Sequence, residues 1–188
     1  MPLLHPRLDG RPAAGRVAPA AAACDPQARL LLRALLHAPV RLVLAGVAAS
    51  LVLTYAVAAV LQPSLAVRPP AVPMPGPRLF LAAGLLSPLA ENLLLWAVVG
   101  LLHRSRRFAA IPGLWWRAAV PAAGFAAAHA ALHGALATST FPAALLLCAL
   151  LTLSLQAGVR VRALACAAGL HSLHNLALLG WMAWRPGA

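Results

Sequence analysis

The sequence predicts an all-α membrane protein, a polytopic helical bundle of about five transmembrane helices preceded by an interfacial helix. Hydrophobic residues make up 62% of the 188 residues, and the mean hydropathy is +0.84. Soluble domains contain only about 45–50% apolar residues. Several apolar runs also approach the roughly 20 residues that a helix needs to cross a bilayer. These two observations argue against a soluble globular protein.

The basic charge fits the same fold class. All fifteen basic residues are arginine, and the formal net charge is +12. On a soluble domain such a charge would first indicate nucleic acid. Here the arginines flank apolar segments, so the lipid bilayer is the expected partner and nucleic acid is not. The Ala, Leu and Arg bias without lysine is typical of a GC-rich genome, which points to a bacterial inner (plasma) membrane.

Two segments precede the predicted spans. Residues 1–24 are rich in Arg, Ala and Pro and lack the apolar core of a signal peptide, which favours a flexible tail over an organellar transit peptide. Residues 25–42, "DPQARLLLRALLHAPVRL", predict an amphipathic helix lying on the membrane. Asp25 is its expected N-cap and Pro26 its first residue.

Five apolar runs then predict a transmembrane bundle over 43–184. The proline-rich linker 62–77 is expected to cross a water-exposed face without forming a helix. The last two connections are short, so the last three spans should form an antiparallel series. The predicted spans are 43–61, 79–102, 118–136, 141–157 and 163–182.

Arginines are distributed unequally between the two ends of these spans. Cytoplasmic connections carry an excess of Lys and Arg. Only Arg68, Arg78 and Arg185 fall on one side. The N-terminus is therefore expected in the cytoplasm, on the side of the nine other flanking arginines: Arg29, Arg33, Arg41, Arg104, Arg106, Arg107, Arg117, Arg160 and Arg162.

Strongly polar residues concentrate in three of the five spans. A charged side chain at the centre of a bilayer costs about 2.5–3.5 kcal/mol, so each needs a reason. Glu91, His129 and His171 each lie roughly 12–18 Å from the outer end of their span, at a shared level. The i, i+4 spacing also pairs residues on one face of two of the helices. The polar set is Glu91 and Asn92, His129 and His133, and His171, His174 and Asn175.

One carboxylate and two imidazoles in an apolar environment can activate water. The carboxylate can take and return a proton, while the imidazoles orient the water, stabilise an oxyanion or bind a metal. Polar residues inside spans also serve transport and helix association. Spacing alone therefore leaves catalysis, transport and packing open.

Three short motifs occur in order along 79–182: "PLAENLLLW" around Glu91, "FAAAH" ending at His129, and "HSLHN" from His171 to Asn175. They resemble the EExxxR, FxxxH and HxxxN motifs of the CPBP family of intramembrane proteases, which includes the type II CAAX prenyl endopeptidases and bacteriocin-processing and self-immunity proteins. The resemblance implies that Glu91 is the water-activating base. It implies that His129 and His171 bind water or a divalent metal such as zinc. It also implies that Asn175 donates a hydrogen bond that stabilises an oxyanion or orients the reactants. Phe125 would be a packing residue.

The first motif departs from the family pattern at two positions. Asn92 stands where the second glutamate is expected, and Trp96 where the arginine is expected. A buried arginine without that carboxylate would lack a partner, so the two changes form a self-consistent neutral pair or mark an inactive relative. His133 and His174 lie outside the assigned roles and are expected to pack between helices or line a cavity.

The leading hypothesis is an intramembrane endopeptidase that cuts a membrane-anchored protein or peptide near a C-terminal signal with water activated by Glu91. The alternative is a catalytically inactive relative that acts as an immunity protein or membrane scaffold. A small proton or metal transporter has the least support, because the five spans show no inverted repeat.

Overall fold

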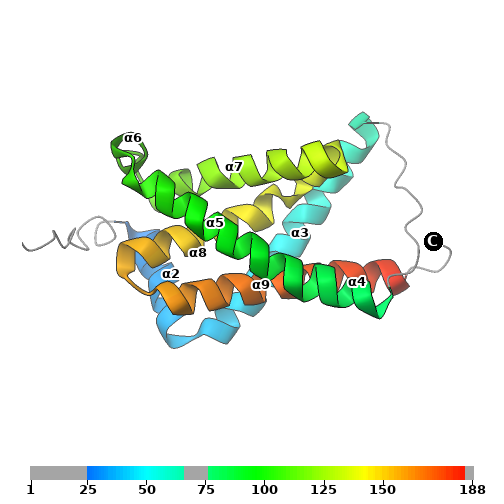
Figure 1. Ribbon diagram of the computed structural model, residues 1–188, viewed down its shortest axis with the longest axis horizontal. Helices are drawn as coiled ribbons and strands as arrows, with labels where there is room; N and C mark the ends of the chain where they lie inside the picture. The colour runs from blue at the N-terminus through cyan, green and yellow to red at the C-terminus, as the bar shows by residue number, and fades with distance from the viewer. Residues whose placement is uncertain (1–24, 66–75, 185–188) are drawn as a thin grey trace, which may run out of the picture.

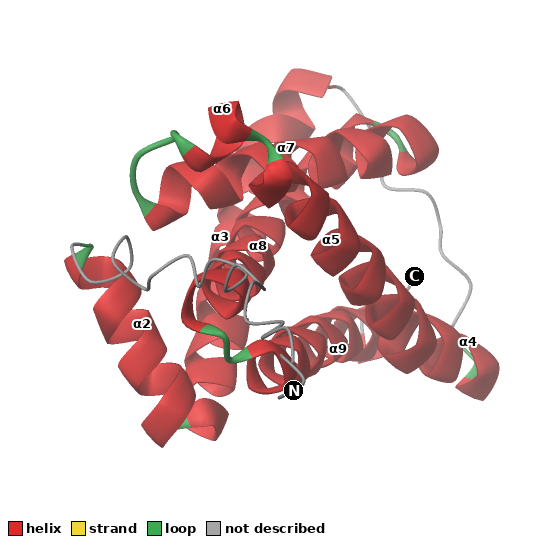
Figure 2. Cartoon of the chain, turned by 60° about the vertical axis from the view of Figure 1, so that its left-hand side comes forward, coloured by secondary structure: helices red, strands yellow, loops and turns green. Residues whose placement is uncertain are grey.

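The computed structural model describes residues 25–65 and 76–184, and within them the chain is helical apart from short connections, with no strand (Figures 1 and 2). The predicted all-α helical bundle is confirmed. The predicted tail, residues 1–24, lies outside the described residues. The elements are α2 (Pro26–His37), α3 (Pro39–Leu65), α4 (Pro77–Leu81), a π-helical turn (Ala82–Leu86), α5 (Ser87–Arg104), α6 (Arg106–Ala109), α7 (Leu114–His133), a 3-10 turn (Ala135–Thr140), α8 (Phe141–Ala157) and α9 (Arg160–Trp184).

The number of membrane spans differs from the prediction. Within the described residues, four helical stretches are long and apolar enough to cross a membrane: Pro39–Leu61, Pro77–Arg104, Ala137–Ala157 and Arg160–Trp181. The predicted span 118–136 corresponds to α7, which is not among them. Arg117 near its start and the two histidines in its second half lower its hydropathy. The helix still runs lengthwise in the bundle (Figure 1) and packs most extensively against α8.

The linker and the interfacial segment also end at other residues than expected. Helix α3 begins at Pro39, directly after Ala38, so within the predicted interfacial segment 25–42 the separate helix is α2, and the last residues belong to α3. At its other end α3 continues to Leu65. The prediction that 62–77 forms no helix is therefore wrong for its first four residues, because a proline in the last turn removes only one backbone hydrogen bond. It is also wrong for Pro77, which begins α4, since a helix tolerates proline in its first turn. Residues 66–75 lie outside the described part.

Helix α2 starts as its sequence predicts. Asp25 is the N-cap, and its Oδ1 accepts hydrogen bonds from the backbone N–H groups of Gln27 (2.9 Å) and Ala28 (3.2 Å). Pro26 occupies the first turn, where its missing N–H costs nothing. At the other end of the helix, Arg162 Nη1 of α9 donates to the carbonyl of Leu36 at 3.0 Å. This contact holds α2 against the start of α9.

Helix α8 forms the centre of the bundle. In its most apolar stretch 67% of the residues are buried within the chain, against 11% for α3. Helices α3, α5, α7 and α9 all pack on it. The outer helices expose large apolar side chains, which suits a lipid environment. The thiols of Cys148 and Cys166 are buried and free.

Candidate active site

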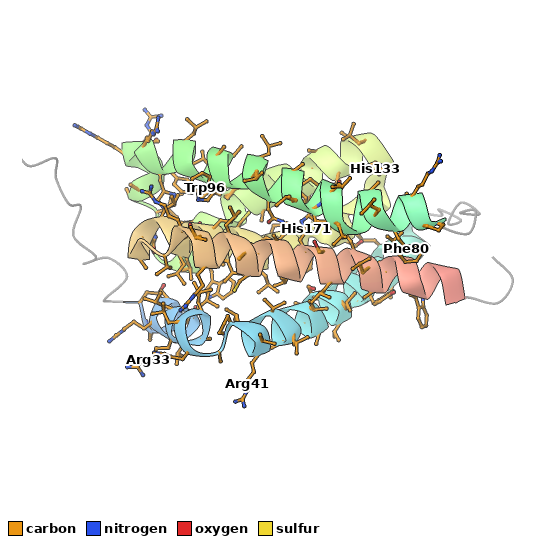
Figure 3. The ribbon with its side chains drawn as sticks, turned by 60° about the horizontal axis from the view of Figure 1, so that its bottom comes forward. Arg33, Arg41, Phe80, Trp96, His133 and His171 are labelled. Atoms are coloured by element: carbon orange, nitrogen blue, oxygen red, sulfur yellow. The ribbon has the colours of Figure 1, made fainter. Side chains whose placement is uncertain are left out.

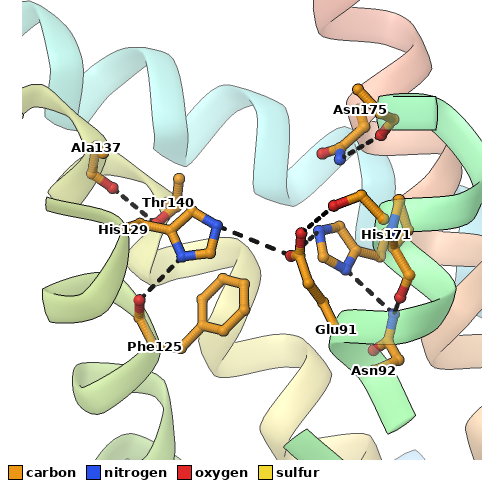
Figure 4. Close-up of polar contacts among 11 residues, drawn as sticks. Glu91, Asn92, Phe125, His129, Ala137, Thr140, His171 and Asn175 are labelled. Atoms are coloured by element: carbon orange, nitrogen blue, oxygen red, sulfur yellow. Dashed lines mark hydrogen bonds and ion pairs between the residues drawn. The ribbon is translucent and has the colours of Figure 1, made fainter. Parts of the chain in front are cut away.

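Three helices bring Glu91, His129 and His171 together (Figure 4). Glu91 Oε2 on α5 lies 3.8 Å from His129 Nε2 on α7 and 3.6 Å from His171 Nε2 on α9. The other carboxylate oxygen, Oε1, accepts a hydrogen bond from the Ser87 hydroxyl. Oε2 is itself buried and has no hydrogen-bond partner. One oxygen is therefore held in place, and the other faces two imidazoles.

The His129 ring is oriented by its own helix. Its Nδ1 lies 3.1 Å from the carbonyl oxygen of Phe125, one turn earlier. Because a carbonyl only accepts, Nδ1 carries the proton, and in the neutral ring the Nε2 lone pair points toward Glu91. The Phe125 ring packs on His129 with a centroid distance of 4.1 Å and lies 6.2 Å from the His171 ring. The two residues of the FxxxH motif thus form one unit.

His171 has the opposite arrangement. Its Nδ1 lies 3.1 Å from Asn92 Nδ2, which also donates to the carbonyl oxygen of Pro88 at 2.7 Å. An amide NH₂ has two protons and can serve both acceptors. His171 Nδ1 then accepts, and the proton of the neutral ring sits on Nε2, facing Glu91. The two imidazoles therefore offer Glu91 a lone pair from one side and an N–H from the other.

Asn175 is not hydrogen-bonded to this cluster. Its Nδ2 donates to the backbone carbonyl of Ala83 at 3.0 Å. Ala83 belongs to the π-helical turn that precedes α5, where the regular α-helical hydrogen-bond pattern is interrupted. The sequence places Asn175 one turn from His171, but its amide connects α9 to the beginning of the Glu91 helix.

The two remaining span histidines lie outside the cluster. His133 is exposed at the end of α7, with its ring centroid 5.8 Å from that of His129. His174 is buried between α9 and α3, and its Nδ1 is 2.8 Å from the Ser50 hydroxyl. That hydroxyl donates to the carbonyl of Val47 at 2.9 Å, so it accepts from the histidine. His174 therefore connects two helices by a hydrogen bond.

The two residues that depart from the family motif are Asn92 and Trp96. Asn92 is fully buried, and Trp96, one turn further along α5, packs against the apolar core. Asn92 Oδ1 and Trp96 Nε1 are both buried without a hydrogen-bond partner. Trp96 thus supplies apolar contact where the family pattern has a cation.

Sequence reasoning missed Ser87 and the contact made by Asn92. Ser87 precedes Glu91 by four residues, so the i, i+4 spacing could have paired them. Asn92 belongs to the predicted polar set and departs from the family motif, but the sequence assigns it no contact. Its contact with His171 depends on how α5 and α9 cross, which no spacing within one helix gives.

The hydrogen bonds also test how these residues fit the expected metal. A histidine that binds a metal offers a lone pair and donates its other ring N–H to an acceptor. His129 meets this requirement through Phe125, whereas His171 does not, because Asn92 donates to its Nδ1. The donor set as hydrogen-bonded does not fit a metal held by both histidines.

Comparisons with protein-family models, with curated proteins and with solved structures found no significant match to this chain. The functional argument therefore rests on the motifs and on the geometry around Glu91.

Proposed function

We propose that the chain is an intramembrane endopeptidase, similar to the CPBP family, that hydrolyses a peptide bond in a membrane-anchored protein or peptide near a C-terminal signal. The observation that supports this most strongly is the approach of His129 and His171 to the one Glu91 oxygen that nothing else hydrogen-bonds. If Glu91 only joined helices, a hydrogen bond to its buried Oε2 would be expected.

The geometry suits a water molecule as the reactant. Glu91 Oε2 and His129 Nε2 are 3.8 Å apart, so a water about 2.8–3.0 Å from each forms the apex of a triangle with them. The side chains of His129 and Glu91 are 23% and 27% exposed, so in this proposal water and substrate approach along these side chains toward the buried Oε2. The side chain of His171 is only 8% exposed and is therefore the least accessible of the three.

In the proposed reaction Glu91 takes one proton from this water, and the water oxygen bonds to the carbonyl carbon of the scissile peptide. The carbon–nitrogen bond of the tetrahedral intermediate then breaks, and Glu91 returns the proton to the leaving amine. His129 orients the water through its Nε2 lone pair. His171 directs its Nε2–H toward Glu91 and stabilises the negative charge there.

The proposed location is the inner membrane of a bacterium, with the N-terminus in the cytoplasm. Arg33 lies near one end of the bundle and Phe80 near the opposite end, with His171 between them (Figure 3). The connections that share an end with α2 carry most of the flanking arginines, which is the cytoplasmic side by the positive-inside rule. The site is then reached from within the bilayer region.

Terminal-peptide profiling of bacterial membranes tests the proposal without a known substrate. The chain is expressed as wild type, as Glu91→Gln, and as Leu94→Ala, a control about one turn along α5 from Glu91 whose residue is 65% exposed. New protein termini should appear with wild type and Leu94→Ala and be lost with Glu91→Gln. Glu91→Gln should accumulate in the membrane at least as well as wild type, because it removes a costly charge. Unchanged termini in the Glu91→Gln sample would refute the proposed base.

The departures at Asn92 and Trp96 support a second candidate, a catalytically inactive relative that acts as an immunity protein or membrane scaffold. This candidate predicts that protection or assembly survives simultaneous alanine replacement of His129 and His171. The endopeptidase proposal predicts its loss.

A further inference from the structure

Asn92 controls which nitrogen of His171 carries the proton. We infer that it is a positioning residue that holds His171 in its Nε2–H tautomer, and that this residue keeps His171 from ligating a metal at the Glu91 site. The inference deepens the proposed function by assigning the site to water held by Glu91 and His129. The tautomer itself follows from contacts that involve no substrate.

The first step is the orientation of the Asn92 amide. Its nitrogen is 2.7 Å from the carbonyl oxygen of Pro88, which can only accept a hydrogen bond. Turning the amide over would place two oxygens at that distance. The contact with Pro88 therefore fixes Nδ2, not Oδ1, as the atom that faces His171.

The second step is the consequence for the imidazole. Asn92 Nδ2 is 3.1 Å from His171 Nδ1, and an N–H donor requires an acceptor there. Asn92 is fully buried and His171 is 6% exposed, so water cannot compensate for two opposed donors. Leaving a buried donor unpaired therefore favours the Nε2–H form by roughly 5- to 150-fold.

The third step concerns metal binding. With its proton on Nε2, His171 has no lone pair toward Glu91, and its other nitrogen is already used by Asn92. A metal ligand at this position would need an acceptor beside Nδ1. An aspartate in place of Asn92 supplies such an acceptor at nearly the same size. Asn92→Asp should therefore turn His171 toward the Nδ1–H tautomer and complete a ligand set with Glu91 and His129.

Nitrogen NMR of the full chain in detergent, with ¹⁵N-labelled histidine and at a pH where the rings are neutral, tests the tautomer directly. The His171 signals are those that disappear in His171→Gln. We expect an unprotonated Nδ1 and a protonated Nε2 in the wild type, and the reverse in Asn92→Asp. A wild-type His171 protonated at Nδ1 would overturn the inference. The wild-type spectrum decides this even where Asn92→Asp fails to fold.

Titration with Co²⁺ alone, followed by its visible absorption, tests the consequence. Asn92→Asp should bind Co²⁺ at least about tenfold more tightly than the wild type, since such outer partners change metal affinity about 10- to 100-fold. Gln156→Glu, which adds a carboxylate at the end of α8 beside Asp25 and Leu114, should not. The inference fails if wild-type affinity falls more than tenfold in His171→Gln. Neither measurement needs proteolysis, so both remain decisive if the proposed activity is absent.

Discussion

Asp25 Oδ2 accepts a hydrogen bond of 3.0 Å from the backbone N–H of Leu114, while Oδ1 of the same carboxylate caps α2. One side chain thus closes the first turns of both α2 and α7, where N–H groups lack helical partners. The Leu114 hydrogen bond is the main cause that holds the pKa of Asp25 below its usual value, and burial acts against it. The N-terminal helix is thereby attached to the helix that carries His129.

The contribution of Asp25 to stability should depend on pH. A carboxyl group whose pKa is lowered by folding stabilises the fold above its unfolded-state pKa, near 3.8, and loses this effect as the pH falls through the folded-state value. Asp25→Asn keeps a cap for α2 but loses the charge, and an amide nitrogen cannot accept from Leu114. Its melting temperature should be lower than that of the wild type between pH 5 and 7, about equally at both ends of that range.

Below pH 4 the difference between the two proteins should shrink. Thermal unfolding in detergent, followed by tryptophan fluorescence, measures it. Asp25→Ala, which also loses the cap, should be less stable than Asp25→Asn by about 1 kcal/mol at neutral pH. A difference between wild type and Asp25→Asn that grows as the pH falls would contradict this account.

The close packing of α3 on α9 is a second testable feature. A Cβ atom added at Gly46 would lie 2.5 Å from Cδ1 of Leu170, a fully packed side chain that is 2% exposed. Gly46→Ala should therefore destabilise the protein by about 1–3 kcal/mol, the usual cost of overpacking. Gly100→Ala is the matched control, since nothing lies within 4 Å of its added Cβ.

The control should be neutral or slightly stabilising, because alanine is favoured over glycine in a helix by roughly 1 kcal/mol. Thermal unfolding of the two variants side by side gives the comparison. Equal melting temperatures would show that α3 and α9 are not packed as closely as described.

Asn175 provides a test between a structural and a catalytic role. The family resemblance implies an oxyanion donor, whereas its amide hydrogen-bonds the Ala83 carbonyl. If the role is structural, Asn175→Ala should lower the free energy of unfolding by about 0.5–1.5 kcal/mol, since a partly buried hydrogen bond between two helical segments is lost. Cleavage per folded molecule should then fall less than tenfold. Loss of an oxyanion donor would instead reduce turnover about 10²- to 10³-fold with little effect on stability.

The fold could be predicted from the sequence to a large extent because its signals are local. The apolar run 141–157 matches α8 to the residue, and the Asp25–Pro26 signature gave the start of α2 correctly. The prolines predicted that the helix ends before Pro63, but the last turn of α3 tolerates Pro63. The prediction of α7 as a span gave too little weight to its polar residues. Arg117 and its two histidines lower the hydropathy of this helix.

For the candidate site, the proximity of its three central side chains could be predicted from the sequence, but their hydrogen bonds could not. Shared depth in three helices predicted that Glu91, His129 and His171 lie together, and in the structure both Nε2 atoms lie within 4 Å of Glu91 Oε2. The direction of each amide depends on helix rotation and on the π-helical turn, which the sequence does not reveal. For this reason the sequence did not predict that Asn175 hydrogen-bonds Ala83 or that Asn92 hydrogen-bonds His171.

Ser87 is the partner of Glu91 that remains to be tested. Its hydroxyl donates to Glu91 Oε1, and the rest of the carboxylate can then direct Oε2 at the histidines. A hydrogen bond to a charged group contributes about 1.5–3 kcal/mol. Ser87→Ala should therefore reduce the cleavage rate about 10- to 100-fold, measured on whichever substrate terminal-peptide profiling identifies.

A positioning role for Ser87 has consequences that general destabilisation does not share. Ser87→Thr keeps the hydroxyl and should restore most of the rate, whereas Ser87→Ala and Ser87→Thr should melt within a few degrees of each other. Combined with Glu91→Gln, Ser87→Ala should cause no further loss, because the proton acceptor that it positions is already gone. An additive loss in the double variant would assign Ser87 a role apart from Glu91.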